Sequence, residues 1–512
     1  MHGPGSLESS ARGLWKELAP EPDRWLGTLR ITIAALLVAV VMLAFRMPFL
    51  SIGPYLVFIL SQRDMLLTRA ASVLAVLVGV LACLLVYFVV FVAWDVAWLR
   101  FSLLAAIFYG GYYLMRILAE PRIILGALVM LALFASSFDT VPYPNGLLDQ
   151  LGWIWAIFGL IFVATFLTQW MLRQPTALEL LRAQMRRILV AAEAACVGAA
   201  FNRPPAGVAP LARDREEAAA RIRTLAGTRF LSPAEADRCR DLLQGCNALL
   251  AAATRENIAD AEEKSRLRAA AGWLRKLRFR VLLGNEAKLD PPAGLPLTPA
   301  LREAFEKLAQ AGSALTRPFD FAPKPHAKPS LVPADWASNP LYASFATRAA
   351  LAIMGCYVFM TLTDWGDIHT CMITCVVTAL AAAEERVLKQ KLRIVGAVIG
   401  GILGTGAVVF VIPRFDSLVA LLFVLAAGTA LAAWVALGGR RMSYAGWQIA
   451  LAFYMTILQD PHPVTKLDAI WDRWVGIVVG ILAMRTAFAL PPLHGLFAQT
   501  PRNRTVLSKG SL

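Results

Sequence analysis

The sequence predicts an all-α integral membrane protein in which two parallel six-helix repeats, about twelve spans in all, are separated by a helical cytoplasmic domain. Composition is the first reason. Of the 512 residues, 58% are hydrophobic and only 17% are charged, and the mean hydropathy is +0.59. A soluble domain this apolar would lack polar surface. The second reason is that two long apolar regions flank a polar, arginine-rich middle, and the third is that the two regions repeat.

Landmarks of the first apolar region recur in the second at a nearly constant offset. Asp95 and Asp416 differ by 321 positions, and Arg30 and Arg348 differ by 318. The offset of 321 also relates four further pairs: Asp139 and Asp460, Pro142 and Pro463, Trp153 and Trp474, and Gly159 and Gly480. Arg69 and Arg393 differ by 324. Membrane proteins built from two equivalent halves usually enclose a pathway between them, which favours transport over duplication without transport.

The individual spans follow from runs of apolar residues, because a helix needs about 20 of them to cross the hydrocarbon core. The first half offers runs near 29–46, 48–61, 70–94, 96–115, 122–138 and 150–172. The second half offers runs near 344–362, 367–383, 391–413, 415–437, 443–459 and 469–490. The run at 48–61 is short and contains Gly53 and Pro54, so it is either a tilted or broken span or a re-entrant segment.

Five segments follow in order. They are a cytoplasmic N-terminal segment (1–28), a first transmembrane bundle (29–172), a cytoplasmic helical domain with a proline-rich linker (173–343), a second bundle (344–490) and a cytoplasmic tail (491–512). Residues 1–28 contain four acidic residues and no uninterrupted apolar stretch, so we expect no secretory signal. Alanine, arginine, glutamate and leucine dominate the middle domain and predict helices near 176–200, 212–227, 232–258, 259–284 and 298–312.

The positive-inside rule orients the spans, because cytoplasmic loops carry the excess of Lys and Arg. With both termini cytoplasmic, the inner loops hold Arg63, Arg69, Arg116, Arg122, Arg386, Lys389, Lys391, Arg393, Arg440 and Arg441. The outer loops hold only Arg46, Arg100, Arg414, Lys466 and Arg473. An even number of spans in each half makes the duplication parallel rather than inverted.

No catalytic or cofactor-binding motif stands out. The sequence has no GxxxxGK[ST] loop, no GxGxxG after a predicted strand, no HExxH and no GxSxG. We therefore expect neither an enzyme nor a cofactor. The spacing of His369, Cys371 and Cys375 fits no standard zinc pattern, so we expect no metal site. The net charge of +15 lies largely beside the spans, where it sets topology, and we expect no nucleic-acid partner.

The most specific local pattern is a row of glycines in the second half. Gly396, Gly400 and Gly404 recur every four residues and so share one helix face, which lets a neighbouring backbone approach closely. Arg393 stands at the cytoplasmic entry of this helix. A packing face with a topology-setting charge accounts for the pattern, and a place on the substrate pathway is the alternative for Arg393.

These features resemble the fusaric acid resistance (FUSC) family, which includes the aromatic acid exporters. The matching features are Arg348 at the start of the second half, the loop Glu384-Glu385-Arg386, Arg393 with Gly396 and Gly400, and the span containing Asp468, Gly476 and Gly480. The first half, with Arg30-Ile-Thr and the loop Ser61-Gln62-Arg63-Asp64, is similar to the drug-efflux permease branch. The resemblance covers residues 25–495. It implies a bacterial inner-membrane efflux permease that works with a periplasmic adaptor and an outer-membrane channel. Many relatives carry a second soluble domain after the last span, a pattern from which this sequence departs.

Charged residues within the bundles are candidates for a substrate or proton pathway. Arg485 lies about 18 Å into the last span, where it binds an organic anion or extends toward the cytoplasmic surface. Asp139 and Asp460 occupy equivalent outer ends and are either proton carriers or solvated caps. Glu384 and Glu385 are either proton-coupled carboxylates or partners of nearby basic residues. The pathway set is completed by Arg30, Arg69, Arg348 and Arg393.

The sequence thus favours a gradient-driven exporter of amphipathic or aromatic weak acids and drugs, embedded in the lipid bilayer and with a homo-oligomer as one possible form. A passive organic-anion channel and a non-transporting envelope scaffold are the alternatives. The sequence leaves the substrate, the coupling ion and the oligomeric state open.

Overall fold

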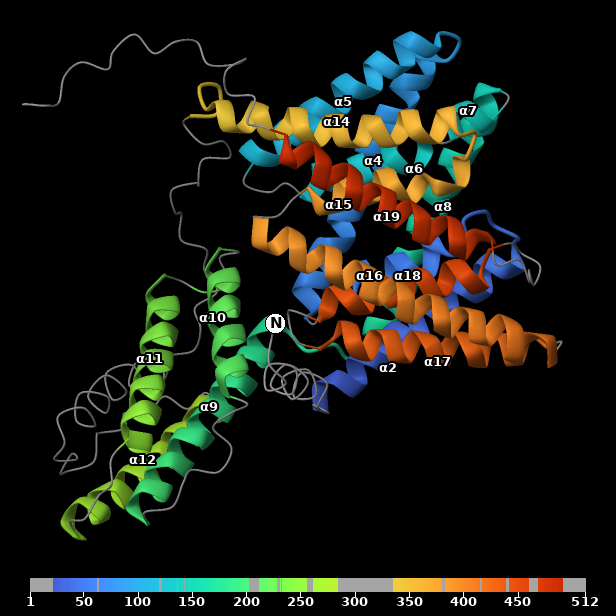
Figure 1. Cartoon of the computed structure of the whole chain (residues 1–512). Helices are drawn as coiled ribbons and strands as arrows, with labels where there is room; N and C mark the ends of the chain where they lie inside the picture. Colours follow the sequence, from blue (N-terminus) through green and yellow to red (C-terminus); the bar gives the residue numbers. More distant parts are fainter. Residues whose placement is uncertain are drawn as a thin grey trace, which may run out of the picture. The chain divides into compact units, whose positions relative to one another are not determined.

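The computed structural model is helical, with no strand in the residues that it describes (Figure 1). These are residues 22–61, 64–118, 122–135, 137–141, 143–201, 211–227, 231, 233–255, 261–283, 335–379, 383–414, 417–438, 442–459 and 468–490. The chain forms two compact units. The membrane unit comprises Met1–Arg63, Leu67–Gln174 and Pro329–Leu512, and the helical domain comprises Asp64–Leu66 and Pro175–Lys328.

Each apolar run of the sequence contains a helix. In the first half these are α2 (Pro22–Ala44), α3 (Ile52–Leu60), α4 (Met65–Ala93), α5 (Ala97–Ile117), α6 (Arg122–Ala135) and α8 (Pro144–Met171), with the single turn α7 (Ser137–Thr140) between the last two. In the second half they are α14 (Pro340–Leu362), α15 (Thr370–Thr378), α16 (Ala383–Gly406), α17 (Leu418–Ala436), α18 (Ser443–Ile457) and α19 (Asp468–Ala489). A short 3-10 turn, Gly366–His369, precedes α15, and α16 continues through Ala407–Val411 and Ile412–Arg414.

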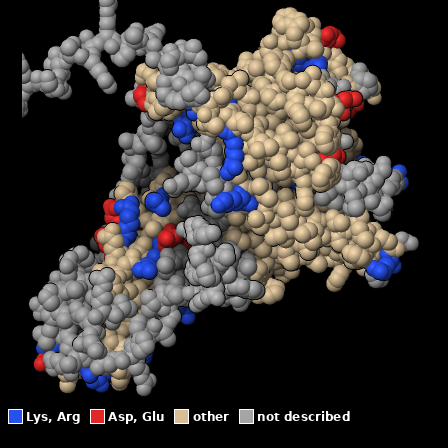
Figure 2. Space-filling view, viewed as in Figure 1, with Lys and Arg blue, Asp and Glu red and all other residues tan. Residues whose placement is uncertain are grey.

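Six helices of the described chain are long and apolar enough to cross a membrane. They are Arg24–Ala44, Leu67–Ala93, Pro144–Met171, Pro340–Leu362, Gln390–Arg414 and Leu418–Ala436. The face of the membrane unit seen in Figure 2 is almost free of charged side chains except at its edges, as expected of a surface that meets lipid. The protein is therefore an all-α protein with several membrane-spanning helices, and the full count of twelve stays a prediction.

The second helix of each half is short. Helices α3 and α15 have nine residues each, about 14 Å, whereas the hydrocarbon core is about 30 Å thick. In the first half, α2 and α4 are both hydrogen-bonded to the residues that follow α8. Nη1 of Arg30 on α2 donates to the carbonyl oxygen of Arg173 at 3.2 Å. Nε2 of Gln174 donates to Oγ1 of Thr68 on α4 at 3.0 Å. Because these contacts lie near the starts of α2 and α4, the segment containing α3 returns the chain to the end of the bundle at which α2 begins.

The turn that ends the first helix is the same in both halves. After α2, the N–H of Met47 donates to the carbonyl of Met42 at 2.9 Å. After α14, the N–H of Trp365 donates to the carbonyl of Met360 at 3.1 Å. The residue before each donor has a positive φ, 49° at Arg46 and 50° at Asp364. Each of these positions differs from its counterpart by 318, the offset that also relates Arg30 to Arg348.

The two halves pack across one another. The first helix of each half contacts the fourth helix of the other, α2 with α17 and α14 with α5. The short helix of each half contacts the fifth helix of the other, α3 with α18 and α15 with α6. A cation–π contact lies at the α2–α17 interface and another at the α14–α5 interface. The guanidinium of Arg24 lies 4.5 Å from the ring centre of Trp434, and that of Arg116 lies 4.7 Å from that of Phe345. One hydrophobic core therefore includes residues of both halves.

The helical domain contains α9 (Ala177–Ala200), α10 (Leu211–Gly227), α11 (Pro233–Arg255) and α12 (Ala261–Leu283). Helix α9 packs against the other three. A capping box begins α9: the N–H of Glu179 donates to Oγ1 of Thr176 at 3.2 Å, and the N–H of Thr176 donates to Oε2 of Glu179 at 2.9 Å. The predicted helix at 298–312 and the proline-rich linker lie outside the described residues.

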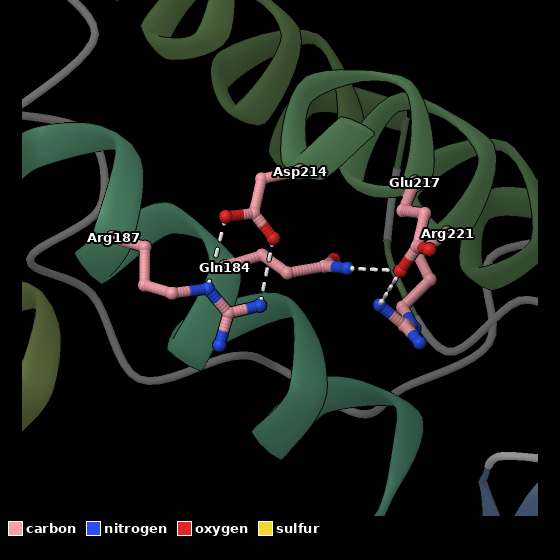
Figure 3. A network of polar contacts seen from close by, with 5 residues as sticks. All are labelled: Gln184, Arg187, Asp214, Glu217 and Arg221. Atoms are coloured by element: carbon pink, nitrogen blue, oxygen red, sulfur yellow. Dashed lines mark hydrogen bonds and ion pairs between the residues drawn. The ribbon is translucent and has the colours of Figure 1, made fainter. Parts of the chain in front are cut away.

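Polar contacts join α9 to α10 at the edge of this domain (Figure 3). Arg187 binds both carboxylate oxygens of Asp214, at 3.0 and 2.7 Å. Nε2 of Gln184 donates to Oε2 of Glu217 at 3.0 Å. Arg221 approaches the same Glu217 oxygen at 3.9 Å. The Arg187–Asp214 and Gln184–Glu217 contacts cross from α9 to α10, whereas Arg221 and Glu217 both lie on α10.

Three cysteines of the helical domain, Cys196, Cys239 and Cys246, lie in its core. Burial raises the pKa of the Cys196 thiol to about 12, with a smaller contribution from Glu193. Burial likewise raises the pKa of Cys246 to about 12. Both side chains therefore stay neutral thiols at physiological pH and act as small core residues.

The most extensive contact between two helices of the membrane unit follows the glycine row of α16. A Cβ atom on Gly396 would lie 2.5 Å from Cβ of Gln448, and one on Gly404 would lie 2.6 Å from Cβ of Thr456. A Cβ atom on Gly400 would collide with the backbone carbonyl of Ile449. These glycines line the α16–α18 interface and let the two backbones touch.

We expect Gly400→Ala to destabilise the protein by about 1–3 kcal/mol, because the new methyl group has no room against the α18 backbone. Gly406→Ala is the matched control on the same helix, since no atom lies within 4 Å of its Cβ position. There, alanine should be neutral or stabilising by up to about 1 kcal/mol through helix propensity. Thermal unfolding of the purified variants measures both. Equal stability of the two variants would contradict the packing.

Candidate functional site

Helices α16 and α19 carry the same eight-residue pattern. Residues 393–400 read R-I-V-G-A-V-I-G, and residues 473–480 read R-W-V-G-I-V-V-G. In a helix, positions i, i+3 and i+7 share one face, so each arginine lies on the same face as its two glycines. On α19 that face packs against α15: a Cβ on Gly480 would lie 2.5 Å from the carbonyl oxygen of Cys371. Each arginine is therefore directed into a helix interface rather than toward lipid.

Arg393 is the largest fully buried side chain of the described residues, with 1% of its surface exposed. Its Nη1 donates to the hydroxyl of Tyr444, in the first turn of α18, over 3.4 Å. Its Nε has no hydrogen-bond partner in the part of the chain that the structure describes. An arginine can donate five hydrogen bonds, so much of this group's capacity is unused.

Arg473 is buried in the same way, with 4% of its surface exposed. Its Nη1 contacts the sulfur of Met455, in the last turn of α18. Its Nε and Nη2 have no hydrogen-bond partner among the described residues. The adjacent carboxylate of Asp472 accepts a hydrogen bond from Nε1 of Trp365 at 2.9 Å and is thereby directed toward α14 and the turn after it.

The two arginines form one electrostatic cluster with two tyrosines. The positive charges of Arg393 and Arg473 repel each other, and both act on the hydroxyls of Tyr55 and Tyr444. Four helices thus contribute to the arginine cluster, which we define as Tyr55 of α3, Arg393 of α16, Tyr444 of α18 and Arg473 of α19. Buried like charges without counterions are strongly unfavourable, and an anion placed between them would offset both.

The counterparts of these residues in the first half are different. Arg69, which precedes Arg393 by 324 positions, is exposed on α4. Gly152 stands 321 positions before Arg473. Arg30 is 8% exposed but donates to the carbonyl oxygens of Leu172 and Arg173. Both arginines of the cluster therefore belong to the second half and have no equivalent pair in the first.

Arg348, the counterpart of Arg30, is half-buried on α14, and its Nε and Nη2 have no partner. Arg485 is exposed on α19, which favours the interpretation that its side chain extends toward the membrane surface over a substrate role. The backbone of Asp139 lies in α7, and that of Glu384 and Glu385 lies in the first turn of α16. The side chains of these three residues, and all of Asp460, are not among the described parts of the chain.

Comparison with known proteins finds a family match for most of the second half. Residues 353–485, which include Arg393 and Arg473, match the family described as fusaric acid resistance protein-like. The chain carries a fusaric acid resistance-like domain. The family resemblance predicted from the sequence is confirmed by this match. No solved structure matches the chain.

Two relatives are bacterial and share one name. The multidrug resistance protein MdtO of Shigella flexneri is 40% identical over 172 residues, which are 33% of this chain and 25% of that protein. MdtO of Escherichia coli strain K12 is 41% identical over 159 residues, 31% of this chain and 23% of that protein. The matched segment spans about a quarter of the length of these relatives.

Sequence reasoning missed Arg473 as a site residue, because it was assigned to an outer loop by charge counting. The signal that could have found it is the pattern shared with residues 393–400. When two glycines follow an arginine by three and by seven residues in a helix, all three residues share one face. If the glycines pack against another helix, the arginine lies on that packing face too.

We expect Arg393→Met to stabilise the protein in the absence of ligand by about 1–4 kcal/mol, because an apolar side chain of similar length removes an unpaired buried charge. Arg30→Met should instead destabilise the protein by about 0.5–1.5 kcal/mol, because it removes the hydrogen bonds to the partly buried carbonyl oxygens of Leu172 and Arg173. Thermal unfolding in a neutral detergent compares the two. A loss of stability in Arg393→Met would show that its charge is already compensated.

Proposed function

We propose that the protein is an inner-membrane efflux permease that exports amphipathic or aromatic weak acids and drugs, driven by an ion gradient. The observation that carries this proposal is a pair of buried, incompletely paired arginines inside the segment that matches the fusaric acid resistance family. Intramembrane charges are costly and usually mark a substrate or ion pathway. The shared name of the relatives, multidrug resistance protein, supports export of drug-like molecules.

The proposed architecture is two parallel repeats of six spans with a pathway between them. The identical turns after α2 and α14 and the crossed packing of α2 with α17 and of α14 with α5 support it. In such proteins the substrate site lies at the interface of the repeats. Tyr55 comes from the first repeat and the other three cluster residues come from the second, which fits that rule.

Coupling to protons would require carboxylates that change protonation along the path. Asp139, Asp460, Glu384 and Glu385 are the proposed carriers, since both pairs lie at ends of helices or loops between spans. Of the arginines that the sequence predicts for the pathway, Arg348 and Arg393 are the proposed cations, because they are at least half-buried with unused donors among the described residues. Arg30 is held by backbone carbonyls and Arg69 and Arg485 are exposed, so these three are not proposed as substrate ligands. As partners we propose a periplasmic adaptor and an outer-membrane channel, together with a second copy of the chain.

A passive organic-anion channel is the second candidate. The observation that favours it is the arginine cluster itself, in which neither arginine forms an ion pair with a carboxylate of the described residues. A positively charged path without a coupling carboxylate would conduct anions down their gradient.

Transport of radiolabelled benzoate into energised inverted membrane vesicles distinguishes the two candidates. For a proton-coupled exporter, we expect uptake to stop when nigericin collapses the pH gradient. For a channel, uptake would persist with nigericin and stop when valinomycin and potassium collapse the membrane potential. Uptake no greater than in vesicles without the protein would contradict both candidates and favour a scaffold.

The proposed topology places the helical domain in the cytoplasm. A membrane-impermeant maleimide added to cells with a permeabilised outer membrane should label Tyr143→Cys, in the outer loop before α8, but not Ala234→Cys in α11. Both positions are exposed in their own unit, and the three native cysteines of the helical domain are buried. Labelling of Ala234→Cys in intact cells would overturn the orientation.

A further inference from the structure

The arginine cluster has donors that no described residue of the chain accepts. Nε of Arg393 and both Nε and Nη2 of Arg473 have no hydrogen-bond partner among the described residues, although both side chains are more than nine-tenths buried. A buried guanidinium without a partner loses the hydration that it has in water and gains nothing in exchange. The mutual repulsion of Arg393 and Arg473 makes the arrangement less favourable still.

The chain does not supply the missing counterion from its described residues. The carboxylate nearest in sequence, Asp472, is bonded to Trp365. The contacts that the cluster does make are to a hydroxyl, Tyr444, and to a thioether, Met455, and neither of these groups carries a negative charge. Within the described residues, the cluster therefore has the composition of a site that lacks its negative charge and can take it from a bound anion.

We propose that Arg393 and Arg473 together hold the anionic group of the exported molecule, a carboxylate on an aromatic or similarly apolar body. Each guanidinium offers donors in the planar geometry that matches a carboxylate, and Tyr55 and Tyr444 offer hydroxyl groups in the same field. Tyr444 and Trp447, with ring centres 6.5 Å apart, provide apolar surface beside Arg393 for the rest of the molecule.

The site is single rather than duplicated. Its first-half counterparts are an exposed arginine, Arg69, and a glycine, Gly152. One anion should therefore bind per chain. This assignment rests on the proposed export function, but binding can be measured without any transport.

The experiment measures binding of benzoate to the purified full chain in nanodiscs of phosphatidylcholine, by isothermal titration calorimetry. Benzyl alcohol, which has the same ring without the charge, is the ligand control. We expect benzoate to bind one site per chain and benzyl alcohol not to bind. Arg393→Gln and Arg473→Gln should each weaken benzoate binding about tenfold or more, since a hydrogen bond to a charged group is lost.

Three further variants separate recognition from folding. Lys391→Gln removes an exposed cation two residues from Arg393 and should bind benzoate like the wild type. Arg473→Lys keeps the charge but loses the two parallel donors, so it should bind more weakly than the wild type. Tyr444→Phe removes only a hydroxyl and should weaken binding by less than either arginine substitution. Elution as a single species in size-exclusion chromatography checks that each variant is folded.

Each outcome decides a separate point. Unchanged benzoate affinity in folded Arg393→Gln and Arg473→Gln would overturn the site, even if the protein transports benzoate. Arginine-dependent binding without transport would support the site and overturn the export function. An anionic lipid is the other source of this chemistry. If phosphatidylglycerol in the nanodisc abolishes benzoate binding and stabilises the wild type but not Arg473→Gln, the cluster is a lipid headgroup site and the substrate assignment fails.

Discussion

The contact between α16 and α18 positions the rest of the second half. It depends on three positions that lack a side chain, Gly396, Gly400 and Gly404, where even a methyl group would collide with α18. Because the backbones touch, the arginine one turn before the first glycine has no route to lipid and lies against Tyr444 instead. The glycines therefore have two effects. They allow close helix packing, and they bury a charge that a wider interface would leave accessible to water.

The two halves share a local turn and differ in their buried polar groups. The turns after α2 and α14 have the same hydrogen bonds at the same offset. The buried arginines of the two halves are held differently. Arg30 is held by backbone carbonyls, whereas Arg393 and Arg473 retain unpaired donors. A structural arginine with its donors satisfied stabilises a fold, and one with unused donors is adapted to bind.

Much of the architecture could be predicted from the sequence, because spans of about 20 apolar residues and a four-residue glycine period are local signals. The helix positions of both halves and of α9 to α12 follow from such patterns. The short α3 agrees with the short apolar run at 48–61, whereas the nine-residue length of α15 could not be predicted from the apolar run at 367–383. The positive φ values at Arg46 and Asp364, in the turns that end α2 and α14, could not be predicted either, since neither residue is a glycine. The burial of Arg473 was also missed. Charge counting treats every arginine near a helix end as exposed, and only tertiary contacts show which face it occupies.

The crossed packing has a consequence for how the protein is made. Helices α2 and α5 of the first half find their partners in α17 and α14, which follow the whole helical domain in the chain. At about 5–20 residues per second, the ribosome needs roughly ten to thirty seconds to synthesise the intervening segment. During that interval the inserted first half exposes α17- and α14-binding surfaces to lipid and to other nascent chains. The helical domain, which has its own core, therefore separates the insertion of the first half from that of the second, although the two halves must pack into one bundle.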